Sequence, residues 1–276
     1  MARTGSGRAR GWAGLGALMA AGMLTGVAAA STVTTSSGRV NIAPMADALD
    51  EPWGIAFLPD SQFLVTERGG RLQIFPPEGG AGIAVSGVPD VTARGQGGLL
   101  DVMVPRDFET SREVWLSFAR AAEGGGAGTA LGVGLLSADG TALEGFRTVF
   151  AAPGAPGGNH FGSRITEAVD GTIFLTIGER NDGPLAQDAQ RPEGKVLHLN
   201  RDGSPATTVP GWLPGVYSMG HRNPQAAALD DSGQLWVIEH GAQGGDEVNR
   251  VLPGRNYGWP VIAYGQDYGG DRKSVV

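Results

Sequence analysis

Short apolar segments alternate with turns rich in Asp, Gly and Pro along most of the chain. Four stretches carry apolar segments on both sides of such a turn, at residues 53–75, 99–118, 163–200 and 224–241. Their apolar positions alternate or form short runs, which is typical of β-strands joined as hairpins. The stretches return roughly every 45 to 65 residues, a spacing typical of the blades of a β-propeller.

Two of the turns, Asp170-Gly171 and Ser232-Gly233, are strong hairpin signals because glycine accepts the positive φ that such turns need. Beyond the first thirty residues no segment sustains the 3.6-residue apolar period of a helix, so the sequence predicts an all-β fold. A β-propeller is favoured because the repeat is too long for single strands of a sandwich. A sandwich with long loops is the alternative.

The expected propeller is incomplete at its C-terminus. The region after Thr35 has room for about four to five blades of this size. A propeller is a closed ring whose last blade meets its first, and residues 271–276 carry no blade pattern. We therefore expect an incomplete propeller domain over residues 36–270, followed by an atypical tail.

The first thirty residues have the order of a secretory signal peptide. Arg3, Arg8 and Arg10 precede an apolar stretch over residues 12–28, and small residues end at Ala30. This order predicts a signal peptide over residues 1–30 and export to the periplasm or beyond. A membrane anchor is the alternative, although the stretch is only marginally long enough to span a bilayer.

Composition narrows the chemistry. The formal net charge is −7 and no basic stripe appears, which argues against nucleic acid as the main partner. The chain has no cysteine, so disulfides, thiolate catalysis and zinc-thiolate sites are excluded. It also lacks a GxSxG elbow, a Walker loop and a strand-linked GxGxxG with a plausible following acid.

Polar residues stand in glycine-rich segments between the predicted strands, where a propeller displays its site. His160 in GGNHFGSRI could act as a general base near neutral pH, or could be an ordinary surface histidine. Arg222 in GHRNPQ could polarise a carbonyl or hold a carboxylate, or could pair with a neighbouring acid. Gln96 in RGQGGLL lies in a third such segment.

A fourth segment, residues 239–249, places Glu239, Asp246 and Glu247 among glycines. Calcium binds about six to eight oxygens, which carboxylates and backbone carbonyls both supply. The spacing is not that of an EF-hand loop. A calcium site and a solvated acidic turn therefore both remain open from the residues alone.

Several ordered segments together resemble the soluble PQQ-dependent glucose/sorbosone dehydrogenase family, which includes the periplasmic aldose sugar dehydrogenases. The resemblance runs from about residue 51 to about residue 267. The segments that carry it are EPWGIAFLPD, GQGGLLDV, NHFGSRI, GKVLHLNRDGS, GHRNPQ, EHG followed by GGDEVN, and NYGWP.

The resemblance implies a six-bladed propeller with pyrroloquinoline quinone (PQQ) over the mouth of its channel. It implies that His160 takes the proton from the anomeric hydroxyl of an aldose while hydride passes to the quinone, giving the lactone. Gln96, His160, Arg222 and Asn223 match cofactor-binding positions, and Arg222 would also stabilise negative charge during reduction. Glu179 stands where many relatives have aspartate, and would orient His160.

The resemblance also implies calcium. Gly241 and Ala242 match two residues whose backbone carbonyls hold the cofactor's ion, and Glu247 and the Tyr257 carbonyl match a second, structural site. Relatives usually have proline at the position of Ala242, so the loop here loses some rigidity. The activity, with an external electron acceptor, is assigned to the intact protein. The alternatives are a calcium-dependent, lactonase-like propeller hydrolase and a non-catalytic sugar-binding propeller.

Overall fold

The computed structural model describes residues 31–122, 125–266 and 268. The chain divides into two units, residues 1–44 and residues 45–276. The expected signal peptide over residues 1–30 and the atypical tail over 271–276 lie outside the described residues. The described part of the first unit is an antiparallel hairpin of β1 (Ser31–Thr35) and β2 (Gly38–Ile42), and every residue of both strands is exposed.

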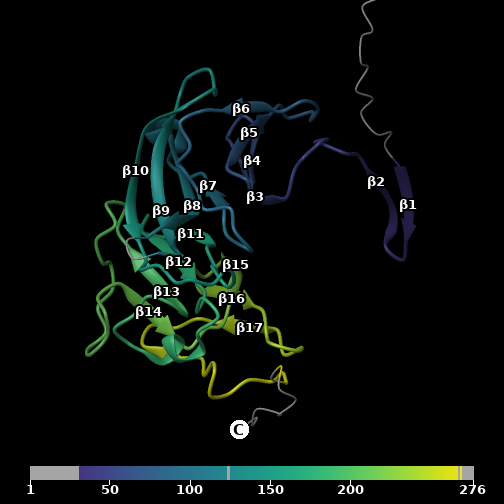
Figure 1. Ribbon diagram of the computed structural model, residues 1–276. Coiled ribbons are helices and arrows are strands. Elements are labelled where there is room, and N and C mark those ends of the chain that lie inside the picture. The colour runs from purple at the N-terminus through teal and green to yellow at the C-terminus, as the bar shows by residue number, and fades with distance from the viewer. Residues whose placement is uncertain (1–30, 123–124, 267, 269–276) are drawn as a thin grey trace, which may run out of the picture. The chain divides into compact units, whose positions relative to one another are not determined.

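The strands of the second unit form four sheets, taken in order along the chain (Figure 1). Within each sheet, consecutive strands pair antiparallel, and β18 adds to the third sheet as a parallel neighbour of β14. The first and second sheets contain β3 (Pro52–Phe57), β4 (Phe63–Glu67), β5 (Arg71–Phe75) and β6 (Ile83–Val85), then β7 (Leu99–Met103), β8 (Glu113–Ala121), β9 (Ala127–Leu136) and β10 (Leu143–Ala151). The third and fourth contain β11 (Ile165–Glu167), β12 (Ile173–Ile177), β13 (Lys195–Leu199), β14 (Val216–Met219) and β18 (Arg255–Asn256), then β15 (Pro224–Leu229), β16 (Leu235–Glu239) and β17 (Glu247–Arg250).

The prediction of an all-β propeller is confirmed, with four blades among the described residues. Helical structure there is limited to α1 (Phe108–Ser111) and the 3₁₀ helix η1 (Gly183–Gln187). Both predicted hairpins are present. The glycines of their turns, Gly171 and Gly233, have φ of 86° and 81°. A side chain would be strained in that conformation, which explains why glycine stands at both turns.

A separate apolar core fills each junction between neighbouring blades. Between the first and second blades, buried Leu64 and Leu72 share a cluster with Leu99 and Leu116. The next two junctions are built in the same way, with Trp115 and Leu131 against Ile173 and Leu175, and Phe174 and Val196 against Leu235 and Val237. Each buried side chain of this size contributes about 1.5–3 kcal/mol to stability, so the junctions hold the blades in order.

Three buried hydroxyls link the inner strands of consecutive blades. Thr176 accepts a hydrogen bond from the Arg164 N–H at 2.9 Å and donates to the Pro224 carbonyl of the next blade at 2.7 Å. Thr66 and Ser117 bridge the two earlier junctions in the same way. In the fourth blade, Ile238 stands at the position that Thr66 has in the first. Isoleucine has no hydroxyl, so the series of bridges ends at this blade among the described residues.

Arg164, just before β11, contacts the first strand of each of the other three blades. Its Nη1 lies 2.5 Å from Asp101 of the second blade, and its Nε donates to the Gln225 carbonyl of the fourth at 3.0 Å. The guanidinium also lies 4.7 Å from the ring centre of Trp53 in the first. Burial raises the pKa of Asp101 to about 6, although Arg164 opposes the rise. Arg164 therefore fixes the four inner strands at one point.

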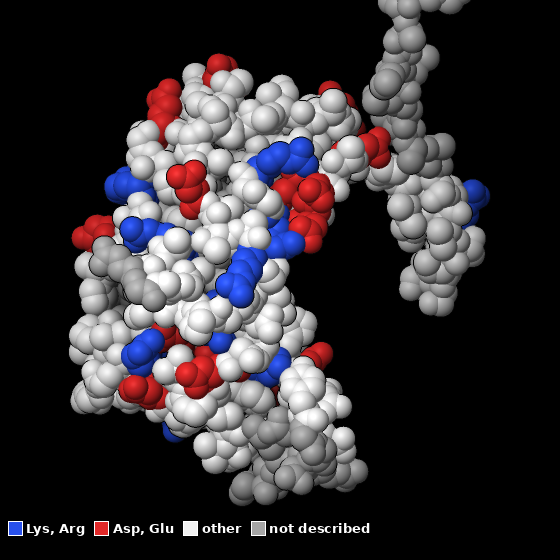
Figure 2. All heavy atoms as spheres, viewed as in Figure 1, with Lys and Arg blue, Asp and Glu red and all other residues white. Residues whose placement is uncertain are grey.

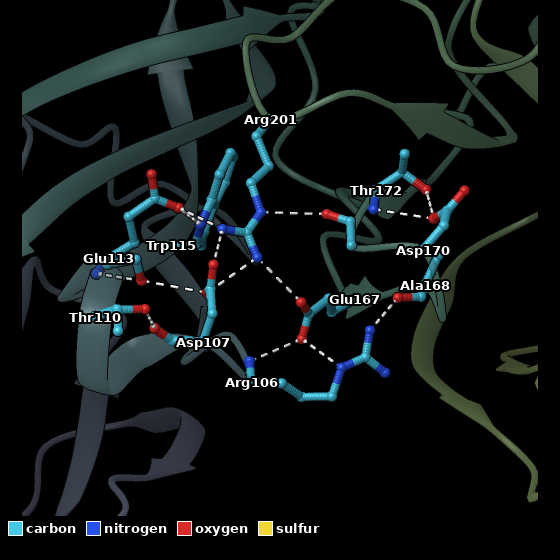
Figure 3. A network of polar contacts seen from close by, with 12 residues as sticks. Arg106, Asp107, Thr110, Glu113, Trp115, Glu167, Ala168, Asp170, Thr172 and Arg201 are labelled. Atoms are coloured by element: carbon cyan, nitrogen blue, oxygen red, sulfur yellow. Dashed lines mark hydrogen bonds and ion pairs between the residues drawn. The ribbon is translucent and has the colours of Figure 1, made fainter.

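At the opposite ends of the strands, an ionic cluster links the second and third blades (Figure 3). Arg201 lies 2.8 Å from Asp107, 3.4 Å from Glu113 and 3.1 Å from Glu167. Arg106 contacts the same Glu167 at 3.3 Å. The hydrogen bond from Arg201 holds the pKa of Asp107 below its usual value. Because one cation meets carboxylates from both blades, the cluster restrains their relative position.

The surface mixes both signs of charge, as Figure 2 shows for one face. The face of the fourth blade that points away from the third blade carries exposed apolar side chains. Trp236, Ile238 and Val248 there are 38%, 50% and 65% exposed. Ile55 and Phe57 of the first blade are also exposed. Among the described residues, no helix has the length and apolar character needed to cross a bilayer.

Candidate active site

The glycine-rich segments singled out in the sequence meet at one end of the blades. Each precedes the first strand of a blade or follows the second, and antiparallel pairing places those two positions at the same end. A cleft of 330 Å³ lies there. Six of the predicted site residues line it, namely Gln96, His160, Arg222, Asn223, Gly241 and Ala242. An adjoining recess of 220 Å³ includes His160, Arg222 and Glu179.

His160 is held at its backbone and at one ring nitrogen. Its N–H donates to Gln96 Oε1 at 2.7 Å, and its Nδ1 lies 2.8 Å from Glu179 Oε2. An ionised carboxylate favours the proton on Nδ1, which leaves a lone pair on Nε2. Nε2 has no partner among the described residues, yet it is not among their buried unpaired atoms, so it can be reached from the cleft. The imidazole can therefore accept a proton there.

Glu179 is suited to hold the imidazole in this state. Its side chain is 3% exposed, and the same Oε2 also accepts the Asn181 N–H. The backbone N–H of Glu179 donates to the Arg222 carbonyl at 2.9 Å, which ties the histidine's partner to the next blade's loop. The extra methylene of glutamate over aspartate is thus accommodated in this loop.

Arg222 places a buried cation beside His160. The residue is 6% exposed, and its guanidinium donates to the His240 carbonyl at 3.2 Å and to the Tyr268 hydroxyl at 3.5 Å. Its guanidinium forms no ion pair within the described part of the chain. Because Arg222 lines the cleft, its charge and remaining N–H donors can meet an anion there. The donor set of this cleft therefore fits an anionic ligand such as a polycarboxylate.

The backbone around Arg222 rests on a buried hydrogen-bonded series. Ser218 Oγ lies 2.8 Å from His221 Nε2, and His221 Nδ1 lies 2.8 Å from Glu239 Oε1. The other oxygen of Glu239 accepts the Arg222 N–H at 2.6 Å. Asn223 Oδ1 in turn accepts the Gly162 N–H at 3.1 Å, so the loops of His160 and Arg222 are joined directly.

The four residues predicted to bind metal occupy two places. Gly241 and Ala242 line the cleft beside Arg222. Glu247 lies on β17, where its Oε2 accepts from Asn249 at 3.2 Å and burial raises its pKa. The Tyr257 ring stacks on His221 at 4.8 Å. No group of three or more His, Asp or Glu side chains suited to a metal ion occurs within the described residues, so calcium here would depend on backbone carbonyls.

Sequence reasoning passed over several contributors to the site. Arg180 supports the His160 loop, and Ser218 and His221 support Arg222 through Glu239. The sequence places Glu239 among possible calcium residues, whereas in the structure its carboxylate binds His221, Asn249 and the Arg222 N–H. A charged pair directly after an apolar strand, as in TIGER, is the signal that could have identified Arg180.

Comparison with known proteins agrees with the motif pattern. The model of the family described as Glucose / Sorbosone dehydrogenase matches residues 49–275. The chain is 43% identical over 248 residues to aldose sugar dehydrogenase YliI of Escherichia coli (strain K12), covering 87% of this chain and 67% of that protein. It is 30% identical over 253 residues to quinoprotein glucose dehydrogenase B of Acinetobacter calcoaceticus, covering 80% of this chain and 52% of that protein.

A solved structure is similar over most of the chain. The PQQ-bound form of aldose sugar dehydrogenase from Streptomyces coelicolor has a TM-score of 0.73 and 32% identity, covering 89% of this chain and 70% of that one. This chain thus spans between half and about two thirds of the length of the two curated relatives.

Proposed function

This chain belongs to the glucose/sorbosone dehydrogenase family, a family of oxidoreductases, and we propose that the intact protein oxidises aldose sugars at the anomeric carbon with PQQ. One observation carries the proposal. The same cleft contains His160, whose Nε2 is accessible, and a buried Arg222 that forms no ion pair among the described residues. An aldose supplies an acidic anomeric hydroxyl, and PQQ carries three carboxylates. In the cleft, His160 is a base for the anomeric hydroxyl and Arg222 is a cation for the carboxylates of PQQ.

His160 acts as the general base. Nε2 takes the proton of the anomeric hydroxyl while hydride leaves C1, so the sugar loses two electrons and becomes the lactone. Glu179, 2.8 Å from Nδ1, stabilises the imidazolium that results and keeps the ring in one orientation. Bound PQQ would supply the two-electron acceptor for the hydride, and an external acceptor would reoxidise it.

Arg222, Asn223 and Gln96 bind and orient the cofactor. The Arg222 guanidinium lies 5.2 Å from the centre of the Trp259 ring and the residue is 6% exposed, so its electrostatic effect on negative charge in the cleft is large. Asn223 and Gln96 each hold a backbone N–H of the His160 loop, so the groups that bind the cofactor also set the position of the base.

Calcium is proposed at two places. The carbonyls of Gly241 and Ala242 would hold an ion beside the cofactor, where its charge offsets cofactor carboxylates. Glu247 and the Tyr257 carbonyl would hold a structural ion. We further propose export by a signal peptide over residues 1–30, with the mature protein in the periplasm or secreted.

Reconstitution tests the function. The purified protein is incubated with PQQ and Ca²⁺, and dye reduction is followed with glucose and other aldoses. We expect quinone-dependent turnover that a calcium chelator abolishes and added Ca²⁺ restores. His160→Ala should lower turnover at least about 100-fold, the usual contribution of a general base, while PQQ still binds. The absence of quinone-dependent dye reduction with every aldose would overturn the proposal, and hydrolysis of a lactone instead would favour the hydrolase.

A further inference from the structure

We propose that Arg180 is a positioning residue that holds the backbone of His160 in its working conformation, an inference that builds on the proposed function. Arg180 directly follows Glu179 after β12, so two adjacent side chains grip one loop. Glu179 binds the imidazole ring, whereas Arg180 binds the main chain just before it. The mechanism above gives Arg180 no part, although it is charged and only 3% exposed.

The guanidinium of Arg180 binds backbone carbonyls and pairs with none of the described carboxylates. Nη2 donates to Gly157 at 2.7 Å and to Ala127 at 3.3 Å, and Nη1 donates to Asn159. Its carbon Cζ lies 3.4 Å from the ring centre of Phe161. Nε alone has no acceptor among the described residues. Burial lowers the pKa of Arg180 to about 10, so the side chain stays charged at neutral pH. Such a cation gains its stabilisation from the loop that it holds.

The loop needs this support because His160 is in the left-handed region, with φ of 55°. A residue with a Cβ pays about 1–2 kcal/mol for that conformation and keeps it only when its surroundings impose it. The Arg180 N–H donates to the His160 carbonyl at 3.3 Å, while its guanidinium fixes the two carbonyls upstream. From the other side, the Gly158 carbonyl accepts the Gln96 N–H at 2.7 Å.

Loss of the guanidinium would leave two loop carbonyls without their charged donor. The loop could then relax toward an ordinary φ and carry Nε2 away from the reacting hydroxyl. A displacement of about 1 Å at a reacting group can cost about 100-fold in rate. Arg180 thus acts on the rate through His160, without touching sugar or cofactor.

The first test uses apoprotein and requires no activity. Ring ¹⁵N shifts of His160 and His221 are measured in wild type, Arg180→Lys and the control Arg147→Lys, which replaces an exposed arginine on β10. We expect Arg180→Lys to change the His160 shifts. His221, paired with Glu239 at the same 2.8 Å, should keep its shifts and serves as the internal reference. Unchanged His160 shifts in a folded Arg180→Lys protein would overturn the proposal.

The second test is kinetic. Arg180→Lys should lower kcat about 100-fold with little change in PQQ affinity, and should have no further effect on kcat in a His160→Ala background. Equal losses in both backgrounds would mean a general structural role and contradict the proposal.

The two tests separate the possible failures. If wild type lacks quinone-dependent turnover, the proposed function fails and the ¹⁵N shifts alone decide the role of Arg180. If Arg180→Lys does not fold, Phe161→Leu removes the ring beneath the guanidinium. That variant should also shift the His160 ring nitrogens, and an unchanged spectrum would overturn the proposal.

Discussion

Lys195 is a buried cation whose removal should change how stability depends on pH. It lies on β13 with none of its surface exposed, and its Nζ donates to the carbonyls of Leu185, Ala186 and Glu193 at 2.8, 3.0 and 2.7 Å. Two of these carbonyls belong to η1, which borders the recess beside His160. The perturbation is Lys195→Met. Methionine has nearly the length of the apolar lysine stem but carries no charge.

The magnitude follows from the pKa of Lys195. Burial lowers it from the usual 10.5 to about 8. Between these two values the unfolded chain binds more protons than the folded protein, so the contribution of Lys195 to stability rises with pH. One pKa unit corresponds to about 1.36 kcal/mol, so the total gain across the window is about 3 kcal/mol.

The assay is urea unfolding followed by tryptophan fluorescence at several values from about pH 7.5 to about pH 10.5. The free energy of unfolding of wild type minus that of Lys195→Met should rise by about 3 kcal/mol over this range. Tyr217 and Tyr257, whose pKa values are raised by burial, contribute to both proteins and cancel in the difference. Arg147→Met should show no such slope. Parallel curves for wild type and Lys195→Met would refute the reasoning.

Two other substitutions test the contacts around the site. Thr176→Val should destabilise the protein by about 2 kcal/mol in urea unfolding, because a buried N–H and the Pro224 carbonyl lose their partner. Thr148→Val, at an exposed position of β10 where the hydroxyl forms no hydrogen bond within the described residues, is the control and should cost less than about 0.5 kcal/mol; equal losses would contradict a special role for the bridge. Glu179→Gln should lower kcat about tenfold or more with PQQ affinity retained, and an unchanged kcat would show that the carboxylate is not needed.

The sequence was sufficient to predict the architecture because its signals are local. Alternating apolar positions decide strands within a few residues, and Asp170-Gly171 and Ser232-Gly233 mark turns by the φ that glycine allows. The number of strands in each blade was harder to predict from the sequence. β18, for instance, is two residues long and pairs with a strand from the preceding blade.

The candidate site was only partly predictable, since its residues act through contacts between blades. His160 and Arg222 stood out by their glycine-rich surroundings. The carbonyls that Arg180 holds, and the oxygens with which Glu239 binds His221 and Arg222, are fixed by packing between segments distant in sequence. No spacing rule indicates that the carboxylate of Glu239 faces a histidine rather than solvent.

The bridging hydroxyls Thr66, Ser117 and Thr176 have a consequence for how accurately a site can be built from separate blades. In a row of stacked units, small errors in alignment add up from one unit to the next. Productive chemistry tolerates about 0.5 Å of misplacement. At each of the three described junctions, a hydrogen bond from one of these hydroxyls fixes the position of the next blade, so an error at one junction is not passed on to the next. The loops of Gln96, His160 and Arg222 can therefore belong to different blades and still meet with the accuracy of neighbours in one strand.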